Sequence, residues 1–481
     1  MPKLITDINL SVAAKNAARC KKQGIILPTI RQQMFPETIP ADIQARLKPI
    51  GLWDVNPLNL FRINWKNDIS TGLFGKPNYF EIPSSISGVK ARIIGLVGKY
   101  FPTGSHKVGA AYGCLAPRLV SGTFDPEIHK AVWPSTGNYC RGGAFDCALL
   151  NCPAIAILPE EMSQERFAWL KEIGAEVFAT PGCESNVKEI YDKCDELRLD
   201  PHNVILNQFE EMGNPFWHYH VTGNSVQEVF EFVRKKNDRL SGYVSATGSA
   251  GTIAAGDFLK TLHPLMKTTA SEAFECPTLL NNGFGGHRIE GIGDKHIPWV
   301  HNVRQTDAVA AIRDEDCMRL LRLFNDPIGL DFLKREGVDA KSVENLSLLG
   351  ISSIGNLLSA IKMAKYFEYD ENDVIFTMFT DSAEMYLSRI DEENTKKGAY
   401  HELQAALDRE AALKAQYYDN FLELSYQDKK RIHNLKYYTW VEQQGKTYEE
   451  INAQWEPEYW AETFETNLDE LDKAIDAFNA M

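Results

Sequence analysis

Features that define several large classes of proteins are missing from this chain of 481 residues. No uncharged stretch is long enough to cross a membrane, and residues 1–7 contain no apolar core followed by a small-residue cleavage site. The nine cysteines include no CxxC pair, and an odd number without regular spacing is typical of free thiols in a reducing compartment. We therefore expect a cytoplasmic protein without a disulfide framework.

An excess of positive charge is also missing. The formal net charge is −14 and no long basic run occurs, although binding to nucleic acid phosphates requires a face rich in Lys and Arg. Neither the GxxxxGK[ST] phosphate loop nor a GxGxxG dinucleotide motif after a strand is present. We expect no nucleic-acid partner and no membrane partner.

What is present is an alternation of short apolar runs with segments of helical periodicity, from about residue 91 to 389. Helices are predicted from Val108, at 163–173 and at 185–197. The strands are predicted at 91–98, 131–133, 154–158, 176–180, 204–206, 242–245, 278–280 and 374–379. This order predicts an α/β fold with parallel sheets covered by helices on both faces, and ligands then bind beyond the carboxyl ends of the strands.

Composition divides the chain into three predicted parts. Residues 1–90 are rich in proline and are expected to form an N-terminal arm that packs on the core. Residues 91–390 form the α/β unit. Residues 391–481 are rich in Glu, Asp, Lys, Tyr and Trp at helical spacing, which predicts a helical C-terminal extension.

The first loop with reactive chemistry is Pro102–Lys107, between a predicted strand and a predicted helix. A lysine amine at such a strand end can condense with an aldehyde cofactor if desolvation lowers its pKa. On the heptad Thr103–Gly109 alone, a loop lysine near a turn with no chemical role is the favoured interpretation.

Two further loops have the same position after a strand. Pro134–Gly143 combines small hydroxyl residues, an asparagine and free N–H groups, which suit a carboxylate but also suit a helix cap. In Gly248–Thr252 the glycines allow close backbone approach, and the following helix directs its positive end at an anion such as a phosphate.

A fourth loop, Phe379–Tyr386, closes the last predicted strand. The neutral hydroxyl of Ser382 could donate a hydrogen bond to a pyridine nitrogen, whereas a carboxylate there would favour the protonated nitrogen. A helix cap at Ser382 is compatible with that role.

In this order the four loops resemble those of the cysteine synthases and cystathionine β-synthases, pyridoxal-phosphate (PLP) enzymes of the tryptophan synthase β-like fold type. The resemblance runs from about residue 91 to 386 and includes the segments 158–177, 207–218 and 290–298. It implies two parallel-sheet subdomains and a homodimer.

The resemblance also implies a role for each loop. Lys107 would be the catalytic residue, holding PLP as a Schiff base and moving the α-proton. Asn138 would contact the 3′-oxygen of the cofactor, Ser382 its pyridine nitrogen, and His106 either its phosphate or only neighbouring side chains. The phosphate would be held by Gly248, Ser249, Ala250, Gly251 and Thr252. The substrate would be bound by Ser135, Thr136, Asn138, Tyr139 and Gln208.

The implied reaction is β-elimination or β-replacement on a small L-amino acid of the cysteine, serine or O-acetylserine type, through an aminoacrylate. The alternatives are an ammonia-lyase or dehydratase acting on serine, threonine or diaminopropionate, and a tryptophan synthase β-like enzyme. His106 favours tryptophan synthase, but Trp133 and Pro134 stand where that enzyme has an acidic residue. The alternative from another class is a scaffold that binds partners through its C-terminal part. The intact Lys107, Asn138 and Ser382 count against it.

Three residues depart from the family pattern. Tyr139 and Cys140 occupy the place of Thr-Gly, where they would either contact substrate and transfer protons or merely narrow the pocket. Asp294 could recognise a substrate amine or cap a turn. No metal is expected, because the alternating His218 and His220 lack a third ligand.

Overall fold

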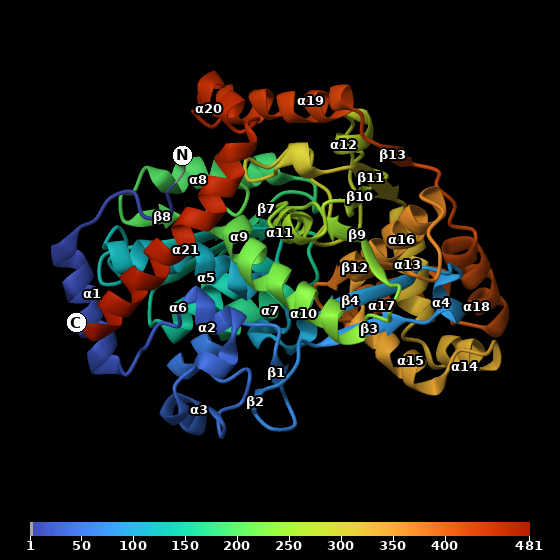
Figure 1. Cartoon of the computed structure of the whole chain (residues 1–481), viewed down its shortest axis with the longest axis horizontal. Helices are drawn as coiled ribbons and strands as arrows, with labels where there is room; N and C mark the ends of the chain where they lie inside the picture. The colour runs from blue at the N-terminus through green and yellow to red at the C-terminus, as the bar shows by residue number, and fades with distance from the viewer. Residues whose placement is uncertain (1–2) are drawn as a thin grey trace.

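Two β-sheets form the frame of the chain in a computed structural model that describes residues 3–481 (Figure 1). The larger sheet has the order β13 (Phe421–Glu423), β11 (Ala308–Ile312), β10 (Lys267–Ala273), β9 (Arg239–Ala246), β12 (Asp373–Phe379), β4 (Arg92–Val97) and β3 (Tyr79–Ile82). The smaller sheet has the order β7 (Glu176–Thr180), β6 (Ala154–Pro159), β5 (Lys130–Pro134) and β8 (Asn203–Ile205). Strands β1 (Asn67–Asp68) and β2 (Leu73–Phe74) pair as a small hairpin.

All pairs within the smaller sheet and all inner pairs of the larger sheet are parallel, which confirms the predicted α/β fold with two parallel sheets. Both edge strands of the larger sheet, β3 and β13, are antiparallel to their neighbours. These strands come from before residue 91 and after residue 390, so both flanking regions complete the sheet. The boundaries at 90 and 390 stay predictions.

Helices cover both sheets and connect their strands. Those of the sheet regions are α4 (Ser84–Ser87), α5 (Lys107–Ser121), α6 (Asn138–Leu149), α7 (Gln164–Glu172), α8 (Val187–Arg198), α9 (Gly213–Trp217), α10 (Gly223–Val233), α11 (Ala254–Leu262), α12 (Thr278–Asn281), α13 (Asp314–Leu323), α14 (Pro327–Arg335), α15 (Ala340–Asn345) and α16 (Ile351–Tyr366). The arm contains α1 (Leu10–Gln23), α2 (Ile30–Met34) and α3 (Ala41–Leu47). None of the helices within residues 3–481 is long and apolar enough to span a membrane.

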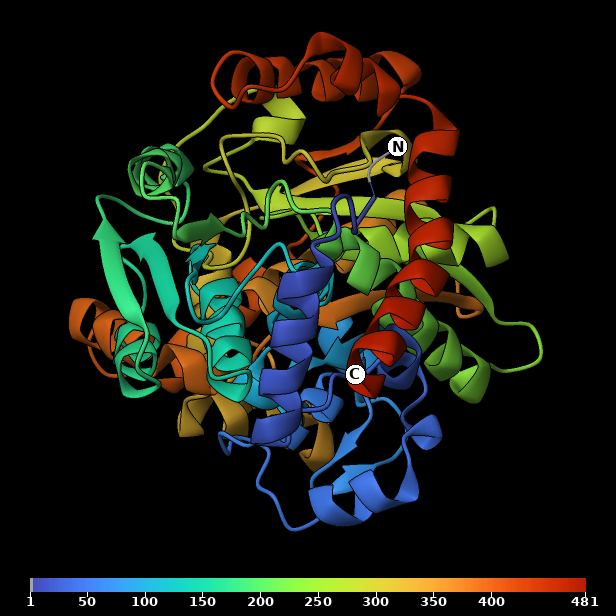
Figure 2. The same ribbon diagram turned by 90° about the vertical axis from the view of Figure 1, so that its left-hand side faces the viewer.

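The C-terminal extension is helical as predicted, and it lies against the core rather than beside it. Its helices are α17 (Leu387–Lys397), α18 (Glu402–Asp408), α19 (Tyr426–Asn434), α20 (Tyr448–Ala453) and α21 (Pro457–Ala480). Figure 2 shows the long α21, in red, running beside the N-terminal α1, in blue. Helix α21 buries Trp460, Phe464 and Phe478 in the main hydrophobic cluster. The Asp472 carboxylate accepts a hydrogen bond of 2.7 Å from the Ile30 backbone N–H at the start of α2. The two ends of the chain therefore stabilise one another.

The predicted strand at Thr278–Leu280 is wrong. This segment is the short helix α12, because the buried Glu272 carboxylate accepts hydrogen bonds from the backbone N–H groups of Leu279 and Leu280 at 2.8 and 2.9 Å. Glu272 belongs to β10, which the sequence analysis did not predict, because its Thr, Ser, Ala and Glu residues do not form an apolar run although nearly all are buried. Strand β11 was also missed.

Candidate active site

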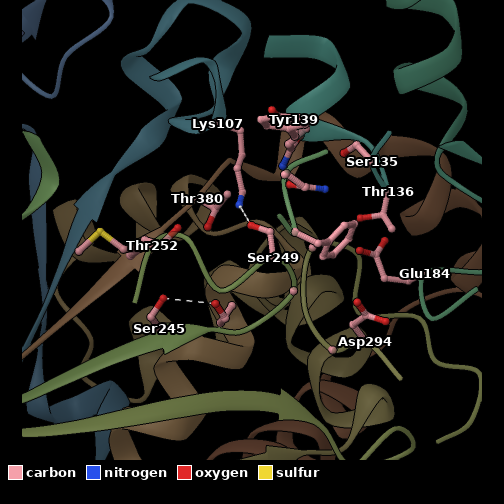
Figure 3. A pocket seen from close by; sticks show the side chains of 18 of the residues that line it. Lys107, Ser135, Thr136, Tyr139, Glu184, Ser245, Ser249, Thr252, Asp294 and Thr380 are labelled. Atoms are coloured by element: carbon pink, nitrogen blue, oxygen red, sulfur yellow. Dashed lines mark hydrogen bonds between the residues drawn. The ribbon is translucent and has the colours of Figure 1, made fainter. Parts of the chain in front are cut away.

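Loops that follow strands of both sheets line one cavity (Figure 3). The loops after β4, β9 and β12 supply one part of its wall, and those after β5, β7 and β8 supply another. It is lined by Lys107, Ser135, Thr136, Asn138, Tyr139, Arg166, Glu184, Val187, Gln208, Phe209, Ser245, Ala246, Gly248, Ser249, Thr252, Gly291, Gly293, Asp294, Asn356, Met378 and Thr380. The position agrees with the rule that ligands of parallel sheets bind beyond the carboxyl ends of the strands.

Most of the site residues expected from the sequence meet in this cavity. Those that line it are Lys107, Ser135, Thr136, Asn138, Tyr139, Gln208, Gly248, Ser249 and Thr252. His106, Ala250, Gly251 and Ser382 do not line it. Ser382 is buried just before a single 3-10 turn, Ala383–Tyr386, and the hydroxyl that reaches the cavity from the end of β12 is that of Thr380.

Lys107 is the first residue of α5, so its amine lies at the positive end of a helix. Its Nζ donates a hydrogen bond of 2.9 Å to the Ser249 hydroxyl of the glycine loop. Desolvation lowers the pKa of Lys107 to about 8, and the opposing attraction of Glu184 is smaller. A lysine with a lowered pKa has a neutral amine available for condensation with an aldehyde.

The glycine loop leaves space for an anion close to its backbone. A Cβ on Gly251 would lie 1.9 Å from the Asn214 Oδ1 atom, and one on Gly248 would lie 3.2 Å from the Gly291 carbonyl oxygen, so Gly251 has no room for a side chain. Ala250 adopts a φ of 55°, in the left-handed region. This loop lies just before α11, and a glycine-rich loop at the start of a helix suits a phosphate.

Two buried, neutral imidazoles contact Thr252 of this loop. His106 Nε2 lies 3.1 Å from Thr252 Oγ1, and His218 Nε2 lies 3.5 Å from the same atom. Burial holds the pKa of both histidines well below the usual value. His106 also stacks on Trp65 with ring centroids 5.4 Å apart. It therefore positions Thr252 and does not itself face the cavity. His218 and His220 have separate partners, Thr222 and the Phe464 carbonyl.

Asn138 lies at the start of α6, beside the last loop of the larger sheet. Its Nδ2 donates a hydrogen bond of 2.6 Å to Asp381, while its buried Oδ1 has no partner within residues 3–481. Asp381 also accepts a hydrogen bond of 2.7 Å from the Tyr386 hydroxyl. Asp381 lies within the loop noted in the sequence, but its neighbour Ser382 was chosen there.

A buried ion pair supports the loop that contains Ser135 and Thr136. Arg166 lies 3.1 Å from Glu290, and both side chains are almost completely buried. Arg166 also donates to the Thr136 carbonyl at 2.6 Å and to the Tyr386 hydroxyl at 2.9 Å. Gly137 adopts a φ of 148°, and a Cβ there would lie 2.2 Å from the guanidinium. Arg166 belongs to a segment noted for its resemblance, but no local pattern distinguished it.

Two of the three residues that depart from the family pattern, Tyr139 and Cys140, already have partners. The Tyr139 hydroxyl donates to the Leu206 carbonyl at 3.1 Å, and the Cys140 thiol donates to the Gly137 carbonyl at 2.9 Å. Burial raises the pKa of Cys140 to about 12, which disfavours a thiolate. These contacts favour the reading in which both residues shape the wall of the pocket.

Glu184 was missed in the sequence and lines the cavity together with Asp294. Glu184 lies in the loop after β7. The one signal that could have identified it is the rule that ligands bind beyond the carboxyl ends of parallel strands.

Three features of the cavity fit PLP. A lysine amine with a lowered pKa faces a glycine loop whose backbone suits a phosphate, and Asn138, whose Oδ1 has no partner within residues 3–481, lines the same cavity. Lys107 would hold the aldehyde carbon, and residues 248–252 would hold the phosphate.

Comparison with known proteins agrees with this fit. Residues 99–330 match the family described as pyridoxal-phosphate dependent enzyme. A cysteine synthase of Staphylococcus aureus is 31% identical over 288 residues, 60% of this chain and 84% of the relative. A cystathionine beta-synthase of Saccharomyces cerevisiae is 28% identical over 331 residues, 66% of this chain and 61% of the relative.

Solved structures share the fold. A hydrogen sulfide-producing enzyme of Fusobacterium nucleatum superimposes with a TM-score of 0.55 at 25% identity, covering 64% of this chain and 96% of the other. An O-acetylserine dependent cystathionine beta-synthase of Helicobacter pylori does so with a TM-score of 0.54 at 24% identity, covering 65% and 95%. The chain belongs to the family of pyridoxal-phosphate-dependent enzymes that includes the cysteine synthases, and pyridoxal 5′-phosphate is its cofactor.

Proposed function

We propose that this enzyme removes the β-substituent of a small L-amino acid of the cysteine, serine or O-acetylserine type, either by elimination or by replacement with a nucleophile. The observation that carries the proposal is the position of the Lys107 amine, 2.9 Å from Ser249 in the glycine loop and in one cavity with Ser135 and Thr136. The names of the relatives, cysteine synthase and cystathionine beta-synthase, support the same class of reaction.

Each group of side chains has a task in this reaction. Bound PLP supplies an electron sink for the negative charge that develops at the α-carbon. Lys107 Nζ accepts the α-proton, which its lowered pKa permits near neutral pH. Ser135, Thr136 and Gln208 bind the substrate carboxylate at the start of α6, and Asn138 orients the cofactor. Arg166 keeps the loop of Ser135 and Thr136 in place through the Thr136 carbonyl.

The family resemblance also supports a cytoplasmic homodimer, which we include in the proposal. The division of the chain into an N-terminal arm (1–90), an α/β unit (91–390) and a helical C-terminal extension (391–481) also belongs to the proposal.

A panel of amino acids tests the proposed reaction. Purified enzyme with PLP is incubated with serine, O-acetylserine, cysteine and 2,3-diaminopropionate, with and without sulfide, and keto acid, ammonia, sulfide and new amino acids are measured. We expect turnover of at least one β-substituted amino acid, with keto acid indicating elimination and a new amino acid indicating replacement. Absence of turnover with all four would contradict the proposal.

A further inference from the structure

Two carboxyl side chains of the cavity have no task in the reaction as described. Glu184 and Asp294 lie on the same side of the cavity, away from Lys107 and Ser249 (Figure 3). They are 2% and 5% exposed. Glu184 Oε2 and Asp294 Oδ2 have no hydrogen-bond partner within residues 3–481, so two buried acceptor atoms are unsatisfied beside the cavity. A buried polar atom without a partner is costly and indicates a missing ligand or a function.

The cations nearby are already engaged. Arg166 pairs with Glu290 at 3.1 Å, and Lys295 pairs with Glu189 at 3.6 Å. His296 lies 3.5 Å from Asp294, but it contacts the other oxygen, Oδ1. Its backbone N–H donates to that same oxygen at 3.1 Å.

The remaining cation of the cavity is the ammonium of Lys107. In the proposed function this amine would be bonded to the cofactor, so it would no longer be a free ammonium group that can pair with Glu184. Asp381, just after the end of β12, is already engaged by Asn138 and Tyr386. The holoenzyme therefore places two carboxyls in a buried wall without a matching cation, an arrangement that favours a positively charged ligand.

We propose that Glu184 and Asp294 form an anionic subsite that selects a diamino acid, that is, an amino acid with a second, cationic amino group at or next to its β-carbon. The inference rests on the proposed function, because it names the substrate class of the same site. Because the α-amino group of the substrate is the group that reacts with the cofactor, the subsite binds the second amino group. Neutral β-substituents, such as hydroxyl or acetyl groups, would supply no positive charge to pair with Glu184 or Asp294.

The electrostatics of Glu184 support this selection. Burial raises the pKa of Glu184 to about 8, and the attraction of Arg166 only partly offsets that effect. Without a ligand, Glu184 is therefore largely protonated at neutral pH, and a bound ammonium group favours its carboxylate form. Binding of a diamino acid should release a proton from Glu184.

Two substitutions test the subsite, and each replaces one carboxyl group by an amide of nearly the same size. For Glu184→Gln and Asp294→Asn, we expect kcat/KM for 2,3-diaminopropionate to fall by about tenfold or more, mainly through KM, as loss of one partner of a buried charge pair predicts. Activity on serine or O-acetylserine should change by less than about threefold, within the range of ordinary substitutions. Glu189→Gln is the matched control, because Glu189 lies in the first turn of the adjacent α8, does not line the cavity and pairs with Lys295.

Calorimetry distinguishes failure of the subsite from failure of the proposed function. The affinity of the holoenzyme for 2,3-diaminopropionate and for alanine is measured in the wild type and in Glu184→Gln, in buffers of different ionisation enthalpy. The subsite predicts tighter binding of the diamino acid and a proton release that the variant lacks. Equal affinities, or equal loss for both ligands in the variant, would overturn it even if serine is turned over. Selective binding without turnover of any amino acid would instead contradict the proposed reaction and leave the subsite supported.

Discussion

The Lys107 amine lies 2.9 Å from the Ser249 hydroxyl, so the lysine at the start of α5 faces the glycine loop that follows β9. These residues are 142 positions apart in the chain. Their contact brings the group that would bind the aldehyde carbon of PLP next to the loop that would bind its phosphate.

The glycine loop should not tolerate a side chain at Gly251. Gly251→Ala would place a methyl group 1.9 Å from Asn214 Oδ1, so the loop must move and we expect the affinity for PLP to fall by at least about tenfold. Titration of the apoenzyme with PLP measures this, and circular dichroism reports whether the variant folds. In the control Gly355→Ala, the nearest atom lies 3.7 Å from the new methyl group, and the affinity should be unchanged. Normal PLP affinity in folded Gly251→Ala would contradict the role of this loop.

Removal of the Arg166 side chain should destabilise the protein strongly. Arg166→Met leaves the buried Glu290 with Arg389 as its remaining cation and takes a donor from the Thr136 carbonyl. Removing one partner of a buried ion pair lowers the free energy of unfolding by about 3–5 kcal/mol. Because Glu290 keeps Arg389 as a second partner, we expect a decrease near the lower end of this range. Denaturation with urea measures it. Arg198→Met removes an exposed pair with Asp195 and should cost less than about 1 kcal/mol. Equal effects of the two substitutions would contradict the structural role of Arg166.

The lowered pKa of Lys107 predicts a pH dependence for cofactor binding. The ordinary lysine pKa of 10.5 falls to about 8, so the ammonium form is lost as the pH rises through 8. Only the neutral amine attacks an aldehyde. The rate at which the apoenzyme acquires the absorption band of bound PLP should therefore rise up to about pH 8 and then level off. A rate that continues to rise toward pH 10 would show that Lys107 has an ordinary pKa.

The C-terminal extension should contribute to the stability of the whole chain. Phe464 of α21 is 1% exposed and stacks on Tyr219, with ring centroids 4.6 Å apart. Phe464→Ala should cost about 3–5 kcal/mol, the usual range for truncation of a buried aromatic residue. Leu403→Ala in α18, where the leucine is 73% exposed, should cost less than about 1 kcal/mol. A single unfolding transition that shifts only in Phe464→Ala would indicate that the extension unfolds with the core.

The sequence predicted the elements whose apolar residues form continuous runs. Strands β4, β5, β6 and β12 were found because their buried residues are Val, Ile, Leu, Trp and Phe. Strand β10 was missed because its buried residues are polar or small, and the contacts that satisfy Ser271 and Glu272 are tertiary, such as Ser271 with Ser359 at 2.7 Å. No local pattern contains that information.

The loops of the site were predicted for a similar reason. Lys107, Asn138 and Gly248–Thr252 follow strands directly, and the order of parallel strands brings their ends together. Arg166, Glu184 and Asp381 were not chosen, because their importance depends on burial and on partners distant in the chain. Arg166 contacts Tyr386, 220 positions away, and Asp381 contacts Asn138, 243 positions away.

The most direct test of the account is to locate the cofactor on the chain. The enzyme is incubated with PLP, reduced with borohydride and digested, and the modified peptide is identified by mass spectrometry, with Lys99→Ala as a control from the same loop region. The account predicts that the cofactor is attached to the peptide containing Lys107, that Lys107→Ala abolishes this label and the visible absorption, and that Lys99→Ala retains both. Attachment to another lysine, or no attachment in the wild type, would contradict it.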